Sequence, residues 1–90
     1  MATVAEMPRT VDLDAHELRV RFSGLSVLKH RRRELRVPRT AIRGISTAPF
    51  GGRRDDRRYF LSYEDPAKTI TVDVDRGETR YGYDVLVIGL

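Results

Sequence analysis

The chain has 90 residues, of which 17 are Lys or Arg and 13 are Asp or Glu; its net charge at pH 7 is +4, and it contains no Cys. A chain of this length forms a single domain, so we expect residues 1–90 to fold as one unit, with residues 1–8 flexible, and we exclude a two-domain enzyme. The lack of Cys excludes a disulfide framework, a thiolate nucleophile, and zinc or iron–sulfur sites held by sulfur.

Alternating apolar and polar residues predict three strands in the first half of the chain. Residues 10–14 and 17–22 both alternate with period two, and the short polar link between them indicates a hairpin. The alternation returns in residues 34–37 and ends at Pro38, because proline cannot donate to a strand ladder. Residues 24–32 stay unassigned, since their apolar positions fit either a helical turn or a bent strand.

A fourth strand and a long loop follow. In residues 42–47, Ile42 and Ile45 cannot share a face at period two, so we expect a bulge or bend near Gly44. Residues 49–58 are rich in Gly, Pro, Arg and Asp, which is the composition of a loop.

The fifth strand is predicted over residues 58–64. Tyr59, Leu61 and Tyr63 share the phase that we expect to face the core, which leaves Phe60 on the other face. We expect most aromatic side chains of the protein to point inward in this way. The pattern therefore argues against an exposed platform on which nucleic-acid bases could stack.

The last two strands are predicted over residues 69–75, where the alternation is cleanest, and 79–90. The final strand has tyrosines and valines on one face and Leu86, Ile88 and Leu90 on the other. An ordinary edge strand is apolar on one face and has its other face in water, whereas this strand is apolar on both. Leaving these three side chains in water would cost roughly 4–8 kcal/mol. We expect the unassigned connection or a second copy of the chain to cover them, and we predict a homo-oligomer, most simply a dimer.

Seven short strands without crossover helices predict an all-β fold, either a small antiparallel bent sheet or a partly open barrel. The sequence has no apolar run of about 18 residues. Its first residues also lack the basic start and apolar segment of a signal peptide. We therefore expect a cytoplasmic all-β domain.

Residues suited to catalysis or metal binding are few. His16 lies in the first hairpin turn and His30 in a basic stretch, which favours two solvated surface histidines. The D-x-D pairs at 12–14 and 73–75 each project two carboxylates about 7 Å apart, too far to chelate one ion unaided. We therefore predict no catalytic residue, no metal site and no cofactor; an aspartate-based enzyme or metal protein is the third and last hypothesis.

Two charge runs suggest an anionic partner. Residues 29–33 (Lys-His-Arg-Arg-Arg) contain no acidic residue that would balance their positive charge. Such a run either attracts phosphate or is a solvated connection. The candidate anion-binding residues are Lys29, Arg31, Arg32, Arg33 and Arg36. Residues 53–58 nearly compensate their own charge, so they fit either a solubilising loop or an anion-binding loop.

The order of these elements resembles the bacterial pleckstrin-homology-like domains over most of the chain. The resemblance rests on the opening hairpin, the basic connection after it, the strand at 34–38 leading into 40–45, and the later strands up to 81–87. It implies a non-enzymatic binding module on a bent antiparallel sheet. Three features depart from the family. The loop between the fourth and fifth strands is shortened, and the C-terminal helix would begin where this chain ends at Leu90. The first hairpin loop, 14–16, is acidic where lipid-binding members are basic.

These observations predict a non-enzymatic binding or assembly module that acts through protein–protein interaction and self-association. Leu86, Ile88 and Leu90 are its candidate self-association residues, and its protein partner stays unidentified. The alternative is an electrostatic binder of nucleic acid or an anionic membrane through residues 29–36. That alternative requires an affinity that falls steeply as salt rises.

Overall fold

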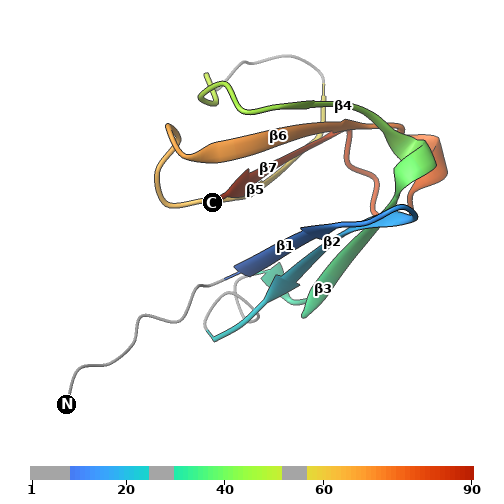
Figure 1. Cartoon of the computed structure of the whole chain (residues 1–90), viewed down its shortest axis with the longest axis horizontal. Helices are drawn as coiled ribbons and strands as arrows, with labels where there is room; N and C mark the ends of the chain where they lie inside the picture. The colour runs from blue at the N-terminus through green and yellow to red at the C-terminus, as the bar shows by residue number, and fades with distance from the viewer. Residues whose placement is uncertain (1–8, 25–29, 52–56) are drawn as a thin grey trace.

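The computed structural model describes residues 9–24, 30–51 and 57–90, which form two layers of strands (Figure 1). The described part contains seven strands and two short 3-10 helices: β1 (Arg9–Leu13), β2 (Glu17–Phe22), β3 (Glu34–Pro38), η1 (Arg39–Ala41), β4 (Ile42–Ser46), β5 (Tyr59–Ser62), β6 (Thr69–Val74), η2 (Arg76–Glu78) and β7 (Val85–Gly89). The sheet orders are β1-β2-β3 and β4-β6-β7-β5. The all-β prediction is confirmed, as an open pair of sheets rather than a closed barrel.

Parts of the prediction fall outside the described residues. These parts are the flexible start at residues 1–8 and most of the unassigned connection, residues 25–29. Within the described ranges, no helix has the length and apolar character needed to cross a membrane.

The first sheet begins with the predicted hairpin, and Asp14 fixes its turn. The Asp14 carboxylate accepts hydrogen bonds from the amide N–H of His16 at 2.7 Å and of Glu17 at 2.8 Å. These bonds, the one from Glu17 first, lower the pKa of Asp14. β2 pairs antiparallel with both β1 and β3, so the apolar phases of the three strands face the second sheet.

The predicted irregularity in the fourth strand is also confirmed. β4 pairs antiparallel with β6, and the register shifts between Ile42 and Gly44. η1 carries the chain from β3 into β4 and so joins the two sheets, with Ala41 fully buried at the junction.

β7 lies inside the second sheet and is buried on both faces. Leu86 lies between Val72 of β6 and Phe60 of β5, and all three belong to the core between the sheets. Val85 faces the other side, where it lines a hollow of about 250 Å³ with Phe50. β7 therefore has protein on both faces and a strand on both edges.

This position corrects the predicted self-association surface. Leu86 is 1% exposed and Ile88 is 0% exposed within a single chain, whereas Leu90 is 62% exposed. The apolar strand does need a cover, as its pattern indicates, but the first sheet supplies it. Leu86 and Ile88 are therefore unavailable to a second copy.

β5 departs from the prediction in two ways. It pairs with β7 in parallel, so the sheets are not wholly antiparallel. Its phase is also inverted, because Phe60 is buried in the core and Leu61 is 44% exposed. Both phases of residues 58–64 carry large apolar side chains, so only the neighbour of β5 decides which phase faces inward.

The last strand is shorter than predicted. It begins at Val85, and residues 79–84 cross the end of the sandwich as an irregular segment. Gly82 in this segment has φ +74, a left-handed conformation that glycine adopts without strain. Tyr81 and Tyr83 are consequently partly exposed instead of lying in a strand.

The intramolecular cover of β7 leads to a stability prediction. Replacing Ile88 by Ala should lower the free energy of unfolding by about 2–5 kcal/mol, because it leaves a cavity in a filled core. The exposed Leu90→Ala control should change it by no more than about 0.5 kcal/mol. Denaturant unfolding at several protein concentrations measures both. Equal effects, or an Ile88→Ala effect that appears only at high concentration, would contradict burial within one chain.

Candidate functional site

The structure joins Ser62 and His30, which are far apart in sequence. His30 is packed against the rings of Phe22 and Phe60 at centroid distances of 5.0 and 4.9 Å. Its Nε2 lies 3.0 Å from the Ser62 hydroxyl oxygen, which also accepts a hydrogen bond from Arg9 Nε at 3.0 Å. The prediction that His30 is a solvated surface residue is therefore wrong, whereas His16 is exposed.

This serine–histidine pair is a structural link rather than a nucleophile. Ser62 is 1% exposed, so a substrate cannot meet its hydroxyl. Arg9 also forms a two-pronged ion pair with Glu64, at 2.9 and 2.7 Å. The network links β1 to β5 through Arg9 and Ser62, and it links β5 to His30.

Replacing Ser62 by Ala should therefore reduce stability. The change leaves the buried Arg9 Nε–H without its acceptor, which typically costs about 1–3 kcal/mol. Thr40→Ala, which removes an exposed hydroxyl, is the control and should cost at most about 0.5 kcal/mol. Thermal or denaturant unfolding compares the two variants, and equal stability of Ser62→Ala and the parent chain would refute the linking role.

The five candidate anion-binding residues have different surroundings. Lys29 lies outside the described residues. Arg31 and Arg33 are exposed and form no ion pair among the residues that the structure describes. Arg32 is partly buried, and Arg36 bonds Glu34 on its own strand.

Arg32 instead lies against the irregular segment 79–84. Its guanidinium carbon is 5.0 Å from the ring centroid of Tyr81 and 6.0 Å from that of Tyr83, within the range of cation–π attraction. The Arg36 amide N–H donates to the Tyr81 hydroxyl at 3.0 Å, and the Tyr83 ring packs on Phe60 at 5.2 Å. Both tyrosines are therefore held at the edge of β3, next to the basic connection.

Another arginine flanks the same segment from the side of β5. The amide of Arg58 donates to the Asp84 carboxylate at 3.1 Å, and the Asp84 amide donates to the Arg58 carbonyl at 2.8 Å. The Arg58 side chain reaches 3.9 Å from where a Cβ would stand on Gly82. We call the combined set the arginine–tyrosine surface: Arg31, Arg32, Arg33, Arg58, Arg80, Tyr81 and Tyr83.

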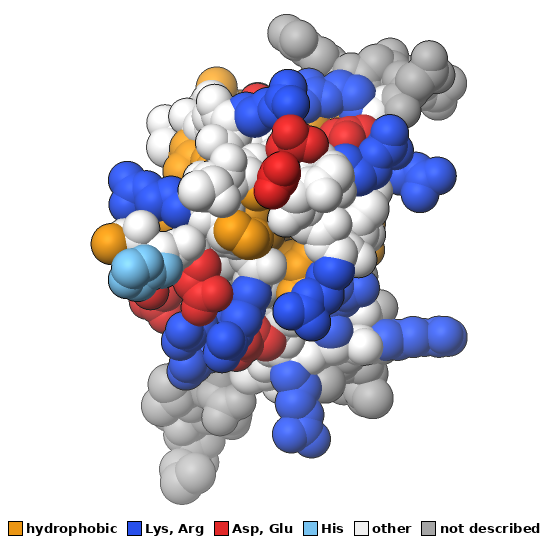
Figure 2. Space-filling model, turned by 90° about the vertical axis from the view of Figure 1, so that its right-hand side faces the viewer, with side chains coloured by type: hydrophobic (Ala, Val, Ile, Leu, Met, Phe, Trp, Pro, Cys, Tyr) orange, Lys and Arg blue, Asp and Glu red, His pale blue; other side chains and the backbone are white. Residues whose placement is uncertain are grey.

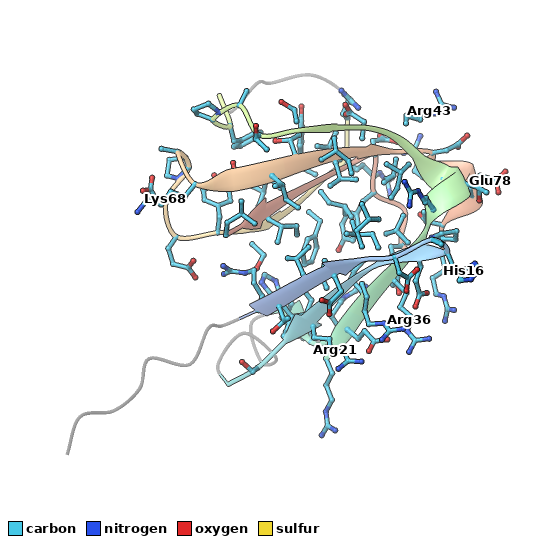
Figure 3. The ribbon with its side chains drawn as sticks, in the orientation of Figure 1. His16, Arg21, Arg36, Arg43, Lys68 and Glu78 are labelled. Carbon is cyan, nitrogen blue, oxygen red and sulfur yellow. The ribbon has the colours of Figure 1, made fainter. Side chains whose placement is uncertain are left out.

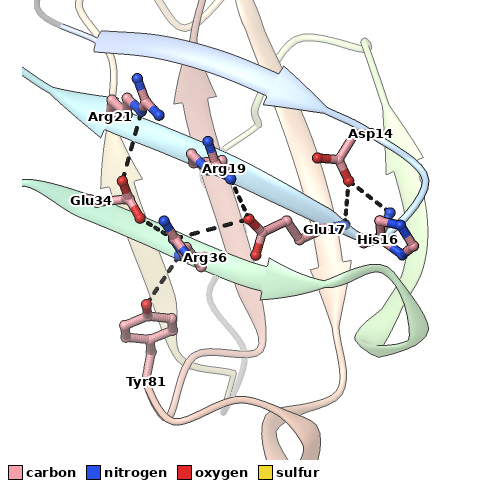
Figure 4. A network of polar contacts seen from close by, with 8 residues as sticks. All are labelled: Asp14, His16, Glu17, Arg19, Arg21, Glu34, Arg36 and Tyr81. Atoms are coloured by element: carbon pink, nitrogen blue, oxygen red, sulfur yellow. Dashed lines mark hydrogen bonds and ion pairs between the residues drawn. The ribbon is translucent and has the colours of Figure 1, made fainter.

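On the outer face of the first sheet, by contrast, carboxylates balance the positive charge of the arginines (Figure 4). Arg19 pairs with Glu17 at 2.7 Å, and Arg21 lies 3.7 Å from Glu34, which also bonds Arg36. The hydrogen bond from Arg36 is the largest cause of the lowered pKa of Glu34. These charges satisfy one another, and exposed pairs of this kind contribute little to stability.

A second cluster of arginines surrounds a hollow of about 340 Å³ beside η2. Three arginines and two aspartates dominate its lining: Arg43, Arg57, Arg76, Asp75 and Asp84. Figure 3 places Arg43 at the same end of the molecule as Glu78 and His16, opposite Lys68. Seen end-on, Lys and Arg side chains are spread over this end, with Asp and Glu side chains among them (Figure 2).

The D-x-D pair at 73–75 forms ion pairs with two of these arginines. Asp73 pairs with Arg57 at 2.6 Å and Asp75 with Arg43 at 2.8 Å. The Asp75 carboxylate also accepts the amide N–H of Gly77 at 3.0 Å. Arginines, rather than a shared ion, therefore engage the carboxylates that the sequence suggested as metal ligands.

The pKa of Asp75 provides a test of this arrangement. The hydrogen bond from Arg43, and then that from the Gly77 amide, hold this pKa below its ordinary value. A carboxyl with a depressed folded-state pKa adds stability that is complete above the unfolded-state pKa and is lost as pH falls through the folded-state value. Arg43→Gln should raise the pKa of Asp75 and move its loss of stability to higher pH. An NMR titration of the carboxyl carbon measures this, and an unchanged pKa in the variant would contradict the pairing.

The sequence reasoning missed Tyr81, Tyr83, Arg58 and Arg80 as surface residues. The available signal was the pair of glycines, Gly77 and Gly82, which punctuate a segment that we assigned to a turn followed by a long strand. Comparison of the chain with protein-family models, with curated proteins and with solved structures finds no match.

Proposed function

We propose that this chain is a non-enzymatic binding module that holds nucleic acid, in single-stranded form, on the arginine–tyrosine surface. The observation that carries the proposal is the Arg32 guanidinium over the Tyr81 ring, which brings a basic connection and two aromatic side chains together. Arginines attract the phosphate backbone, and aromatic ring faces stack on unpaired bases.

The charges around the tyrosines support binding rather than mere solvation. Arg31, Arg33, Arg58 and Arg80 are all exposed, and none forms an ion pair with another described residue. The compensated face of the first sheet has no such surplus. Self-association through Leu86 and Ile88 is not part of the proposal, because both are buried.

A nucleic acid fits this surface better than an anionic membrane does. The exposed large apolar side chains of the described residues are Leu13, Ile45, Leu61 and Leu90. They come from β1, β4, β5 and the chain end, not from the tyrosine segment. A lipid surface would therefore find few apolar side chains to take up beside these arginines.

A salt titration with an oligothymidylate of about ten nucleotides tests the proposal. The logarithm of the affinity should fall linearly with the logarithm of salt concentration. The double variant Arg31→Gln, Arg33→Gln should lower the slope by about 1.4, which corresponds to two lost phosphate contacts at about 0.7 each. The charge-matched control is Arg21→Gln, Lys68→Gln, which should change the slope much less.

The tyrosine contribution has its own pair of variants. Tyr81→Leu removes the stacking ring and should weaken binding about tenfold, whereas Tyr81→Phe keeps the ring and should bind like the parent chain. Fluorescence anisotropy measures the affinities, and circular dichroism checks that each variant is folded. An unmeasurable affinity at low salt, or equal slopes for the two double variants, would overturn the proposal. Binding to phosphatidylserine vesicles without binding to the oligonucleotide would replace nucleic acid by membrane.

A further inference from the structure

The hollow of about 250 Å³ lies over Val85, on the face of the second sheet that is turned away from the core. Tyr59 of β5, Val85 of β7 and Asp73 of β6 are register partners across three neighbouring strands. Their side chains therefore point to the same face of the sheet. Val85 is 1% exposed, so it lies at the bottom of the hollow, with the Tyr59 ring on one side and the Asp73 carboxylate on the other.

Two aromatic rings give the hollow a surface on which a flat ligand can stack. The Phe50 ring comes from the segment after β4, and its centroid lies 5.7 Å from that of Tyr59, with the ring planes at 59°. Both side chains are partly exposed. A flat ring that stacks on one of them meets the other at an angle, and bases stack on aromatic side chains in this way.

The charges of the hollow balance one another. The charged residues in its described lining are Arg57 and Asp73, and Arg57 Nη2 donates to Asp73 Oδ1 at 2.6 Å. The lining therefore favours a ligand without net charge. A carboxylate has about four lone-pair positions, and the Asp73 side chain is 44% exposed. Its bond to Arg57 thus leaves it able to accept a hydrogen bond from a neutral ligand.

Hydroxyl groups line the hollow on the side of β4. Ser46 and Thr71 are register partners between β4 and β6 and share the outer face. The Ser46 hydroxyl accepts the amide N–H of Ala48 at 3.1 Å and has its own proton to donate. Pockets for drug-sized ligands measure about 300–1,000 Å³, so this hollow suits a smaller molecule. A small, flat, uncharged ring with polar groups on its edge fits the description, and a nucleobase is such a ring.

The hollow also adjoins the arginine–tyrosine surface, because Arg57 in its lining is followed directly by Arg58 of that surface. We infer that the hollow takes up one base of the bound strand and selects a base that carries an amino group, an inference that rests on the proposed function. An amino group donates to a carboxylate, as cytosine N4 does to aspartate. Uracil and thymine have a carbonyl oxygen at that position, which the Asp73 carboxylate repels.

Cytidine and uridine test the inference, because they share the sugar and ring size and differ on the pairing edge of the base. Millimolar cytidine should shift the amide resonances of Gly51 and Thr71, and uridine should bind at least about fivefold more weakly. Asp73→Asn should remove this difference. Asp12→Asn removes the same charge from an exposed position of β1 and should keep it. Phe50→Leu should abolish both sets of shifts while the remaining resonances show a folded chain.

Three further measurements separate this inference from the proposed function. Arg31→Gln, Arg33→Gln lies outside the hollow and should keep the cytidine preference, and an oligocytidylate of about ten nucleotides should bind the parent chain more tightly than the matching oligothymidylate. A cytidine preference without oligonucleotide binding supports the hollow and would sink the proposed function alone. Equal shifts from cytidine and uridine, shifts that survive Phe50→Leu, or equal shifts from ribose alone, which would indicate a sugar site, overturn the inference even if oligonucleotides bind.

Discussion

Five consecutive buried residues in β7 require protein on both faces of the strand and a neighbour on both of its edges. The chain meets this requirement by placing β6 and β5 beside β7 and by folding the first sheet over Leu86 and Ile88. Val85, where β7 begins, pairs with the first residue of β5 and with Asp73 near the end of β6, so the residues before it run past the ends of both neighbouring strands. Residues 79–84 cross the end of the sandwich, with Gly82 in a left-handed conformation, and so bring Tyr81 and Tyr83 to Arg32.

The distribution of ion pairs determines which arginines remain for a ligand. On the first sheet, Glu17 and Glu34 form ion pairs with the arginines beside them. Beside η2, aspartates orient Arg43 and Arg76 without hiding them. Arg31 and Arg33 have no carboxylate partner among the described residues, and Arg32, between them in the chain, lies against Tyr81. Carboxylates thus pair with the arginines of one face, whereas Arg31 and Arg33 are left for the ligand that we propose.

Alternation along the strands was enough to predict seven strands, the opening hairpin and the irregularity at Gly44. Alternation could not show which side chains of β5 point to the core, because Phe60 and Leu61 are both large and apolar. Only the pairing with β7 decides between them. It could not place His30 either, since the contacts with Ser62 and Phe22 come from distant segments. The apolar pattern did show that Ile88 needs a cover, but not that the cover lies in the same chain.

The contact between Arg32 and Tyr81 is the most direct point at which to test this account, because the placement of the proposed binding surface depends on it. Nuclear Overhauser effects measured on the parent chain should connect the Arg32 side-chain protons to the Tyr81 ring, and ring currents should shift those protons upfield. Effects that instead connect the backbone of residues 79–84 to a neighbouring strand, with no Arg32 contact, would show that the tyrosines continue β7 and would contradict the account.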